Sequence, residues 1–350
     1  MPIDELAPAP NDLSAVLSPA WLSQALQGAF PGVVVGDVDE VESLESTARK
    51  VRIRVSYQET ADQDAPTAFC IKGYFNPEYV QFGYTGIHEV HFYDRLAARV
   101  PILVPTARYT GIEPESQHGL VLMDDIVANG GEFFDQLSWY DAATAQTSMR
   151  ELAGLHARFW GDALSAEEWL APKIRRFPDY ISDETLDELL RGRRAEGFPE
   201  SMRDAARLKA GMFALADRYA GKPRTLLHAD LHLGNLYRSA DGRIGFIDWQ
   251  NYEFGHWSMD VAYHLATALQ PSERAERERS LLEFYLAQLA EQGGPVMTLD
   301  EAWEDYRAAL LYGYFLWGIT RRVEPRITEE LTQRLGHAVL DHDSLEVLGV

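Results

Sequence analysis

The residues best suited to chemistry lie in two short segments of the second half of the chain. The pattern H-x-D-x-x-x-x-N contains Asp230 and Asn235, and Asp248 follows 18 residues after Asp230. Asp241 and Gly242 between them predict a tight turn, so a second strand would bring Asp248 back beside Asn235. A carboxylate and an amide oxygen would then converge on a hard cation such as Mg²⁺, which prefers oxygen ligands. The other carboxylate, that of Asp230, would receive a proton from an alcohol.

This set of groups is the one that phosphoryl transfer needs. Its transition state spreads negative charge over the phosphoryl oxygens, so positioning and electrostatics supply most of the rate. We therefore expect Asp230 to orient the acceptor hydroxyl and take its proton, while Asn235 and Asp248 hold Mg²⁺ between the phosphates. A turn, a cap or a salt bridge would explain each residue alone, but the three at this spacing favour function. His228 is expected to hold the loop by hydrogen bonds, and the role of His232 stays open.

The first third of the chain is expected to be rich in strands. Residues 1–10, with three prolines, predict a loose arm, and Ser18 and Pro19 predict a helix start. Alternating apolar residues then predict a set of strands and one helix. The strands are expected at 33–41, 51–56, 67–72, 106–110 and 119–123, and the helix at about 86–99.

The rest of the chain is expected to be mostly helical. Helical periodicity covers 140–160, 185–194, 201–219 and the residues after Met259, with short apolar runs between Leu226 and Asp248. We place the boundary at Asp124 and Asp125. The predicted organisation is an arm at 1–17, a small β-rich half at 18–124, and a larger, mostly helical half at 125–350 that contains Asp230, Asn235 and Asp248.

These motifs resemble the aminoglycoside phosphotransferase and choline kinase-like superfamily, and within it most closely the ecdysteroid kinase-like branch. The resemblance rests on His228 to Asn235, on Ile247-Asp248-Trp249-Gln250, and on Gly255 and Asp260, and it covers roughly residues 18–320. It implies an α+β, protein kinase-like two-lobed fold with a small β-rich N-lobe and a larger, mostly helical C-lobe. It also implies that Asp260 heads a helix and braces the catalytic loop.

The resemblance further implies a lysine on the third strand of the N-lobe, paired with a glutamate on the helix. Lys72 ends the apolar run Phe69-Cys70-Ile71, and Glu89 lies near the start of the expected helix, with Glu78 as the alternative partner. From the residues alone, such a lysine requires an anion, which a phosphate or a carboxylate would supply. The simpler alternative is an exposed lysine at the end of a strand. We expect Lys72 and Glu89 to serve nucleotide binding.

The phosphate loop and the hinge are less well marked. Residues 44–50 contain no glycine, although Ser46 and Thr47 are small enough to let backbone N–H groups approach phosphates. Arg49 and Lys50 would either add positive charge there or be solvated surface residues. Met123 ends an apolar strand and resembles the hinge whose backbone reads the purine edge, so ATP is expected and GTP is an alternative. Asp125 could equally cap a helix.

Composition limits the partners. The net charge of −22 repels nucleic acid and anionic membranes, although an acidic surface also simply favours solubility. The single cysteine, Cys70, allows neither an internal disulfide nor a cysteine zinc site, which fits a reducing cytoplasm. The first residues lack the features of a secretory signal, so none is expected, and the longest apolar stretch, 308–319, is short for a membrane span. We expect a cytoplasmic monomer or homodimer with no nucleic-acid or membrane partner.

The acceptor is expected to be a small-molecule alcohol. Aromatic residues of the helical half could line its pocket, but at helical spacing most should be core: Tyr252, Trp257, Tyr263, Tyr306, Tyr312, Tyr314, Phe315 and Trp317. The sequence thus predicts an ATP-dependent O-phosphotransferase, with an aminoglycoside or macrolide kinase as an alternative. A catalytically inactive, nucleotide-binding relative is a further alternative. A protein kinase is disfavoured, because no A-P-E-type segment follows Asp248.

Overall fold

The structure is a computed structural model of the chain. It describes residues 7–45, 48–59, 64–76, 78, 83–161, 163–164, 170 and 172–350. Ser46 and Thr47, expected to approach phosphates, lie outside the described residues, as do residues 1–6 of the predicted arm. The chain divides into two compact units. The sheet unit comprises Met1–Glu132 and Tyr237–Asn251, and the helical unit comprises Phe133–Leu236 and Tyr252–Val350.

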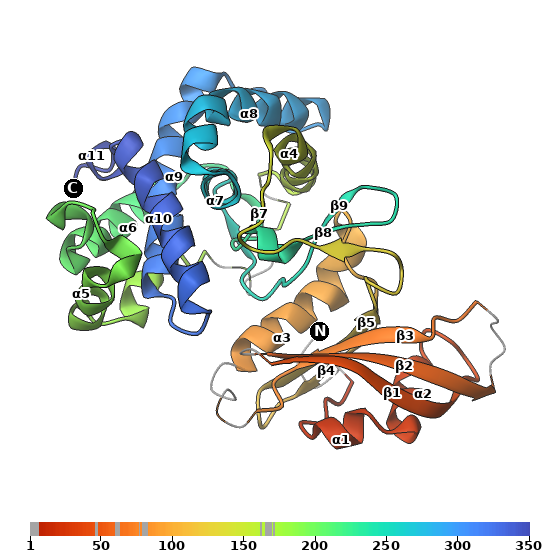
Figure 1. The fold of residues 1–350 in the computed structure, drawn as a ribbon. Coiled ribbons are helices and arrows are strands. Elements are labelled where there is room, and N and C mark those ends of the chain that lie inside the picture. The colour runs from red at the N-terminus through yellow and green to blue at the C-terminus, as the bar shows by residue number, and fades with distance from the viewer. Residues whose placement is uncertain are drawn as a thin grey trace. The chain divides into compact units, whose positions relative to one another are not determined.

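The sheet unit is built on five antiparallel strands in the order β1-β2-β3-β5-β4 (Figure 1). The strands are β1 (Val34–Glu45), β2 (Arg49–Glu59), β3 (Ala68–Gly73), β4 (Ala107–Glu113) and β5 (His118–Asp124). The helices are α1 (Leu13–Val16), α2 (Pro19–Leu26) and α3 (Gly83–His91). A π-helical turn, Phe92–Leu96, and a 3-10 turn, Ala97–Arg99, continue α3, so the helix expected at about 86–99 is present in three geometries.

The alternation of side chains gives the sheet two different faces. On one face, Val51, Ile53, Phe69 and Ile71 pack with α2 in a buried apolar cluster. The other face of β2 and β3 carries charged side chains at intervening positions. Figure 1 shows α2 on one side of the sheet and α3 on the other. The chemistry of the sheet unit is therefore placed on the face that α2 does not cover.

The described N-terminal residues, from Ala7 to α2, are more regular than the sequence suggested. Ser18 caps α2 with Pro19 in its first turn, as expected. The prediction of a loose arm, however, is wrong for residues 7–9. Ala7 bridges to Gly111 at the edge strand β4, and Ala9 is buried. The backbone of these residues covers an otherwise open sheet edge, a protection that the proline content did not reveal.

The turn expected at Asp241 and Gly242 connects the two strands of a short hairpin. Its strands are β8 (Leu236–Arg238) and β9 (Ile244–Phe246), which form a small sheet in the order β6-β8-β9 with β6 (Glu132–Phe133). Gly242 adopts a positive φ of 85°, which a residue without a Cβ accepts at little cost. The hairpin therefore links the loop that ends at Asn235 to the strand that precedes Asp248.

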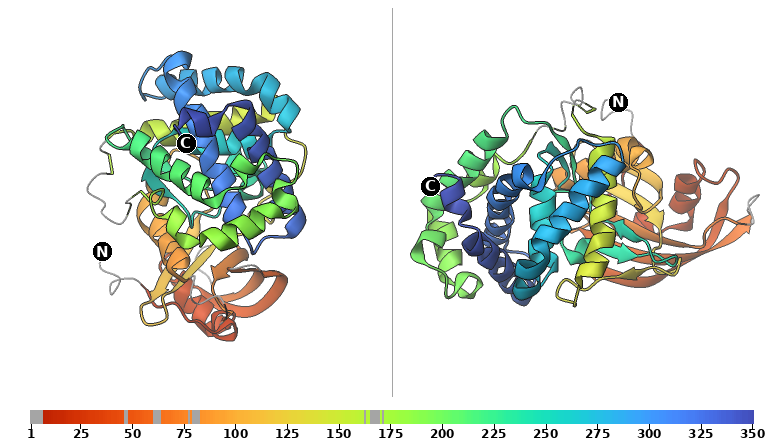
Figure 2. Two further views of the ribbon diagram at one scale, coloured as in Figure 1. Left: turned by 90° about the vertical axis from the view of Figure 1, so that its left-hand side faces the viewer. Right: turned by 90° about the horizontal axis from the view of Figure 1, so that it is seen from above.

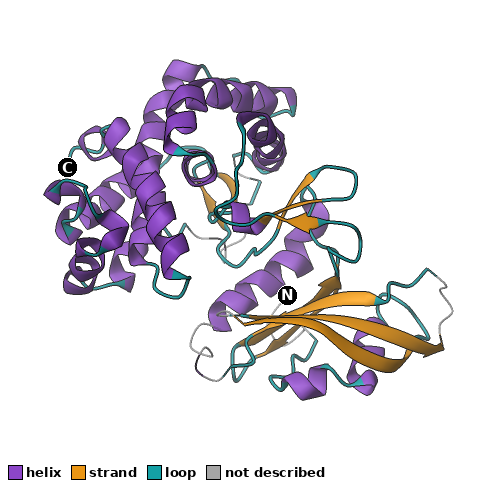
Figure 3. Ribbon diagram, viewed as in Figure 1, coloured by secondary structure: helices purple, strands orange, loops and turns teal. Residues whose placement is uncertain are grey.

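The helical unit contains most of the helices (Figure 3). They are α4 (Ala142–Arg158), α5 (Asp183–Arg191), α6 (Ala205–Tyr219), α7 (Ser258–Ala268), α8 (Pro271–Glu291), α9 (Leu299–Ile319), α10 (Pro325–Asp341) and α11 (Ser344–Val347). Two short strands, β7 (Thr225–Leu227) and β10 (Glu253–Gly255), pair antiparallel. The 3-10 turns are Phe177–Tyr180, Arg193–Ala195, Glu200–Met202 and Leu233–Asn235.

Helix α7 forms the centre of the helical unit. Every residue of α7 is buried, which is typical of a helix surrounded by others. It packs against α9, while α4 and α8 lie side by side (Figure 2). The apolar stretch 308–319 lies inside α9, as a buried segment. Across the described part of the chain, no helix combines the length and apolar character that crossing a membrane requires.

Candidate functional site

Four charged side chains meet on the face of the sheet that α2 does not cover. Lys72 Nζ lies 2.6 Å from Glu89 Oε2 and 2.8 Å from Asp248 Oδ1. Lys50 Nζ lies 3.1 Å from Asp248 Oδ2. Lys72 and Glu89 are almost fully buried, at 5% and 3% side-chain exposure, whereas Lys50 is 32% exposed. The ion pair expected between Lys72 and Glu89 is therefore present, and the structure adds Lys50, whose role the sequence left open.

The register of the sheet explains why an anion sits at this position. Lys50 on β2 is directly opposite Lys72 on β3, so two positive charges share one face. Like charges directly opposite each other destabilise a strand pair unless a counter-charge lies nearby. The Asp248 carboxylate supplies that charge, with one oxygen bound by each lysine. The face is thus constructed to hold a negatively charged group between two ammonium groups.

Lys72 and Asp248 both carry charge at neutral pH. Burial disfavours the charged ammonium of Lys72, but Asp248 and Glu89 outweigh burial and raise its pKa above the ordinary value. Burial likewise opposes ionisation of Asp248, but Lys72 and Lys50 together hold the pKa of its carboxyl well below the usual range. Asp248 is consequently an anion with two oxygen donors, as a ligand for a hard cation must be.

The backbone around Asp248 and the helix that carries Glu89 are both held firmly. Asp248 has a positive φ of 65°, a conformation that costs a non-glycine residue roughly 1 kcal/mol or more. The next residue, Trp249, stacks on Phe92 with ring centroids 4.0 Å apart and fixes the chain there. On α3, Gly86 lies so near Gly119 of β5 that a Cβ on Gly119 would meet its carbonyl carbon at 2.4 Å. This close approach brings α3, and with it Glu89, against the sheet.

The hinge candidate Met123 is buried near the end of β5. Met123 is directly opposite Cys70 on β3, and Lys72 lies two residues after Cys70 and opposite Val121. Met123 and Lys72 therefore belong to the same face of the sheet. Asp125, whose role was open, caps the turn that follows β5. Its Oδ1 accepts a hydrogen bond of 2.9 Å from the Val127 N–H. The role of Met123 in reading a purine stays a prediction.

In the helical unit, Asp260 holds the backbone of the loop that carries Asp230. Its Oδ2 accepts the His228 N–H and its Oδ1 accepts the Ala229 N–H, both at 2.7 Å. Ala229 has a φ of 64°, so the loop contains a strained residue where these bonds act. The Ala229 carbonyl also accepts the Tyr312 hydroxyl at 2.6 Å. The brace that the family resemblance assigned to Asp260 is present in the structure.

Side chains within the loop fix its shape. His228 Nδ1 accepts the Asp230 N–H at 3.3 Å, which agrees with the expected hydrogen-bonding role of His228. His232 Nδ1 accepts the Gly234 N–H and caps the 3-10 turn 233–235. Asn235 Nδ2 donates to the Asp230 carbonyl at 2.8 Å. Because the amide nitrogen is used in this way, the amide oxygen of Asn235 is oriented as the acceptor or ligand of that side chain.

The Asp230 carboxylate is bound by a buried aromatic residue. Tyr263 donates its hydroxyl to Asp230 Oδ1 at 2.7 Å, and Trp317 Nε1 donates to the Tyr263 oxygen at 2.7 Å. Sequence reasoning grouped Tyr263, Tyr312 and Trp317 with residues that are mostly core. They are buried, but all three also hydrogen-bond the loop or its partner. Helical spacing could not separate these roles, because a core aromatic and a hydrogen-bonding one recur with the same period.

The donor chemistry of the expected metal site fits Mg²⁺. Asp248 supplies an ionised carboxylate and Asn235 an amide oxygen, both hard ligands. Within the described ranges, no group of three or more His, Cys, Asp or Glu side chains is placed to hold a metal ion. Asn235 belongs to the helical unit and Asp248 to the sheet unit, so their meeting around one cation stays a prediction.

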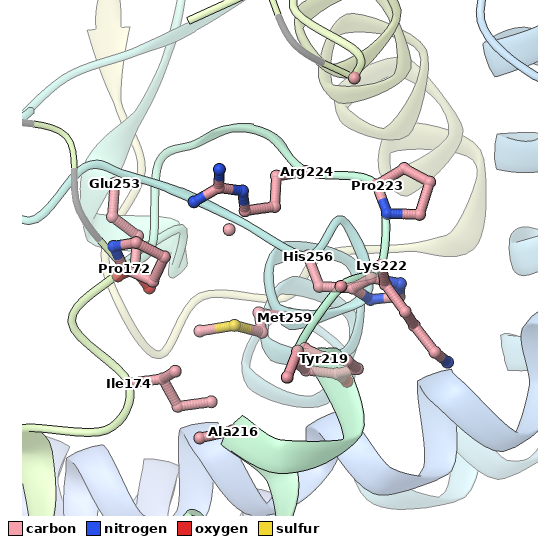
Figure 4. A pocket seen from close by; sticks show the side chains of 14 residues that line it. Pro172, Ile174, Ala216, Tyr219, Lys222, Pro223, Arg224, Glu253, His256 and Met259 are labelled. Atoms are coloured by element: carbon pink, nitrogen blue, oxygen red, sulfur yellow. The ribbon is translucent and has the colours of Figure 1, made fainter. Parts of the chain in front are cut away.

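A cavity of about 520 Å³ lies in the helical unit beside β7 and β10 (Figure 4). Its lining includes Glu253, Arg224 and His256, and does not include Asp230 or Asn235. Glu253 is fully buried, and burial raises the pKa of its carboxyl to about 7. The neighbouring Lys173 opposes this shift through its backbone N–H and its charge, whereas Asp260 adds to it. Because neither Asp230 nor Asn235 lines it, this cavity is separate from the loop that carries Asp230.

Comparisons with known proteins agree with this arrangement. The sequence model of the phosphotransferase enzyme family matches residues 87–330. A comparison with curated protein sequences finds no match.

Among solved structures, a choline kinase from Streptococcus pneumoniae is 14% identical with a TM-score of 0.50, covering 91% of this chain and 98% of its own. An ethanolamine kinase from Plasmodium vivax is 11% identical, TM-score 0.54, over 86% and 81%. The GDP complex of an aminoglycoside 2'-phosphotransferase-IIIa is 16% identical, TM-score 0.53, over 93% and 99%. These likenesses confirm the expected protein kinase-like fold.

Proposed function

The chain belongs to the phosphotransferase enzyme family, and from this premise we propose that it is an ATP-dependent O-phosphotransferase acting on a hydroxyl group of a small molecule. The observation that carries the proposal is the anion held between Lys50 and Lys72 on the face of the sheet that α2 does not cover. A site that holds a carboxylate between two ammonium groups suits the phosphates of a nucleotide equally well.

In the proposed complex, Lys72 binds phosphate oxygens and Glu89 keeps its ammonium in place. Lys50 is the more exposed of the two lysines, so it is the group that exchanges Asp248 for a phosphate oxygen. Ser46 and Thr47 are proposed to offer backbone N–H groups to the phosphates. Main-chain groups at the hinge, near Met123, would read the purine. Backbone contacts leave the choice between ATP and GTP open, with ATP preferred.

Asn235 and Asp248 would hold Mg²⁺. When bound, this ion would neutralise charge on the phosphates. Asp230 acts on the acceptor side: it orients the hydroxyl in line with the γ-phosphoryl group and accepts its proton as the new O–P bond forms and the bond to the departing nucleoside diphosphate breaks. Because Asp260 and His228 fix the loop backbone, Asp230 needs little reorganisation to take this role.

We rank the acceptor classes to be tested by charge. A net charge of −22 raises the local concentration of cationic molecules, so amino alcohols, from choline-like compounds to aminoglycosides, are the first acceptors to test. Choline, ethanolamine and aminoglycoside kinases are also among the structural neighbours. Macrolide and sterol alcohols, the latter in line with an ecdysteroid kinase-like assignment, form the next group. We propose a reducing cytoplasm as the compartment, as one cysteine allows.

The test is a screen of nucleotide consumption with Mg-ATP and Mg-GTP against these alcohols, followed by the Asp230→Asn variant. We expect turnover with at least one acceptor class, and a loss of about 10²- to 10⁴-fold in Asp230→Asn because the base is removed. Asp217→Asn, which changes an exposed ion pair with Arg175, is the matched control and should keep full activity.

Undiminished turnover by Asp230→Asn would exclude Asp230 as the base. If Mg-nucleotide raised the melting temperature of the wild-type chain but no acceptor gave turnover, the catalytically inactive, nucleotide-binding alternative would replace the proposal.

A further inference from the structure

A directed chain of hydrogen bonds ends on the Asp230 carboxylate. Trp317 Nε1 donates to the Tyr263 hydroxyl oxygen, and the Tyr263 hydroxyl donates to Asp230 Oδ1, each at 2.7 Å. An indole N–H can only donate, so the Tyr263 oxygen must accept from Trp317. The proton of the Tyr263 hydroxyl is thereby directed toward Asp230.

These two hydrogen bonds are buried and both point toward Asp230. Tyr263 is fully buried and Trp317 nearly so, which excludes water as a competing partner. Burial and the adjacent Asp230 carboxylate raise the pKa of Tyr263 well above its ordinary value, so its hydroxyl keeps the proton that it donates. The Tyr263 hydroxyl is therefore a permanent donor to the carboxylate.

One face of α7 holds consecutive parts of the catalytic loop. Asp260, Tyr263 and His264 lie at positions i, i+3 and i+4, which share a helix face. Asp260 binds the backbone N–H groups of residues 228 and 229, Tyr263 binds the side chain of residue 230, and His264 Nδ1 donates to the Leu231 carbonyl at 3.0 Å. The loop is thus held at four consecutive residues by a single buried helix.

We infer that Tyr263, supported by Trp317, is a positioning residue for phosphoryl transfer: it holds Oδ1 of Asp230 and so fixes the rotation of the carboxylate toward the acceptor hydroxyl. This inference rests on the proposed function, in which Asp230 is the base. Fixing a general base in its productive orientation lowers the barrier of the chemical step and leaves nucleotide binding unchanged. Loss of the donor therefore reduces kcat and spares KM for the nucleotide.

The variant Tyr263→Phe keeps the ring and removes the hydroxyl. We expect a fall in kcat of about tenfold, the range of one hydrogen bond to a charged group, with KM for the nucleotide unchanged. Trp317→Phe removes the supporting donor and should lower kcat in the same direction by a smaller factor. The matched control is Tyr306→Phe, which removes a buried tyrosine bond of 2.9 Å to the Glu278 carboxylate, elsewhere in the helical unit.

Tyr306→Phe should lower the melting temperature and leave kcat at the wild-type value. The inference is overturned if Tyr263→Phe keeps the wild-type kcat, or if Tyr306→Phe lowers kcat by the same factor, since both results mean that Tyr263 is only a core residue.

A crystal structure of Tyr263→Phe makes the test independent of turnover. The expected result is an Asp230 side chain rotated away from its wild-type orientation, and an unchanged orientation overturns the inference. Absence of turnover in the wild-type chain would count against the proposed function alone, because the orientation of Asp230 in the variant would still decide the positioning role.

Discussion

The sheet unit and the helical unit hold the carboxylates proposed for phosphoryl transfer by different means. Asp248 in the sheet unit is bound by two charged lysines, one of them 32% exposed. Asp230 in the helical unit is bound by the neutral hydroxyl of a buried tyrosine, and its loop is tied down by backbone N–H groups that donate to Asp260. The first arrangement can exchange one anion for another, whereas the second keeps one geometry.

This difference matches what each side of a phosphoryl transfer must do. A nucleotide brings phosphates and a metal ion, so its site must give up one set of ionic contacts and make another. A general base must already point at its proton when the acceptor arrives, so its site benefits from contacts that no ligand displaces. We therefore expect substitutions in the sheet cluster to respond to salt and nucleotide, and substitutions around the loop to respond to neither.

The largest expected effect is that of Lys72→Met. This change leaves Glu89 and Asp248 buried without their shared cation, so the free energy of unfolding should fall by about 4 kcal/mol. Urea unfolding measures it. The control is Arg175→Met in the exposed pair with Asp217, which should cost about 0.5 kcal/mol or less. Equal losses in the two variants would mean that the cluster does not stabilise the sheet unit.

Asp260→Ala should have the next largest effect. It leaves two buried N–H groups, of His228 and Ala229, without acceptors, and we expect a loss of about 3 kcal/mol that 0.5 M salt leaves unchanged. Asp204→Ala is the matched control, because it removes an exposed helix cap worth about 1 kcal/mol. A strong salt dependence in Asp260→Ala would break the contrast between the two units.

Much of this architecture was predictable because it depends on local spacing. The strands, the turn before β9, the Lys72–Glu89 pair and the Asp260 brace each follow from a pattern within a few tens of residues or from a family motif. The burial of residues 7–9 against β4 was not predictable, because nothing local in a proline-rich segment specifies a partner strand.

The unpredicted contacts join distant parts of the chain. Lys50 and Asp248 are 198 residues apart, and their meeting depends on strand register, which a single sequence does not reveal. The spacing of Tyr263 and Trp317 in the sequence is that of core aromatic residues. Only the side-chain geometry shows that Trp317 donates a hydrogen bond to Tyr263, and Tyr263 donates one to Asp230. Sequence patterns thus identified the charged residues of the site, but not the contacts between distant residues that hold the carboxylates in place.

The next prediction concerns Glu253, a buried carboxyl of the helical unit, and how the unfolding free energy of Glu253→Gln differs from that of the wild type across pH. The pKa of Glu253 is raised to about 7, above its ordinary value, mainly by burial, so folding opposes its ionisation. The folded chain therefore binds more protons than the unfolded chain between the ordinary carboxyl range and pH 7, and this group lowers stability as pH rises through that window.

We expect Glu253→Gln to exceed wild type in unfolding free energy by about 2 kcal/mol at pH 8, with the difference vanishing near pH 4. Chemical denaturation across this range measures it, and Glu200→Gln, a change at an exposed glutamate, serves as control. A difference that is constant with pH would mean that Glu253 does not titrate in this window.

The smallest expected effect is that of Lys50→Gln. Because Lys50 is 32% exposed, its pair with Asp248 should contribute less than about 1 kcal/mol, and 0.5 M salt should reduce that further. KM for the nucleotide should rise in the variant. Arg54→Gln, an exposed position on the same face of β2, should leave KM unchanged. Identical KM values for the nucleotide in both variants would exclude Lys50 as a phosphate ligand.

The division of labour between the two carboxylates is tested most directly by calorimetric titration of Mg-nucleotide into Asp248→Asn and Asp230→Asn. The account predicts that Asp248→Asn weakens binding by at least about tenfold, or 1.4 kcal/mol, while Asp230→Asn binds as the wild type does. Equal affinities for the nucleotide in all three proteins, or a loss confined to Asp230→Asn, would contradict it.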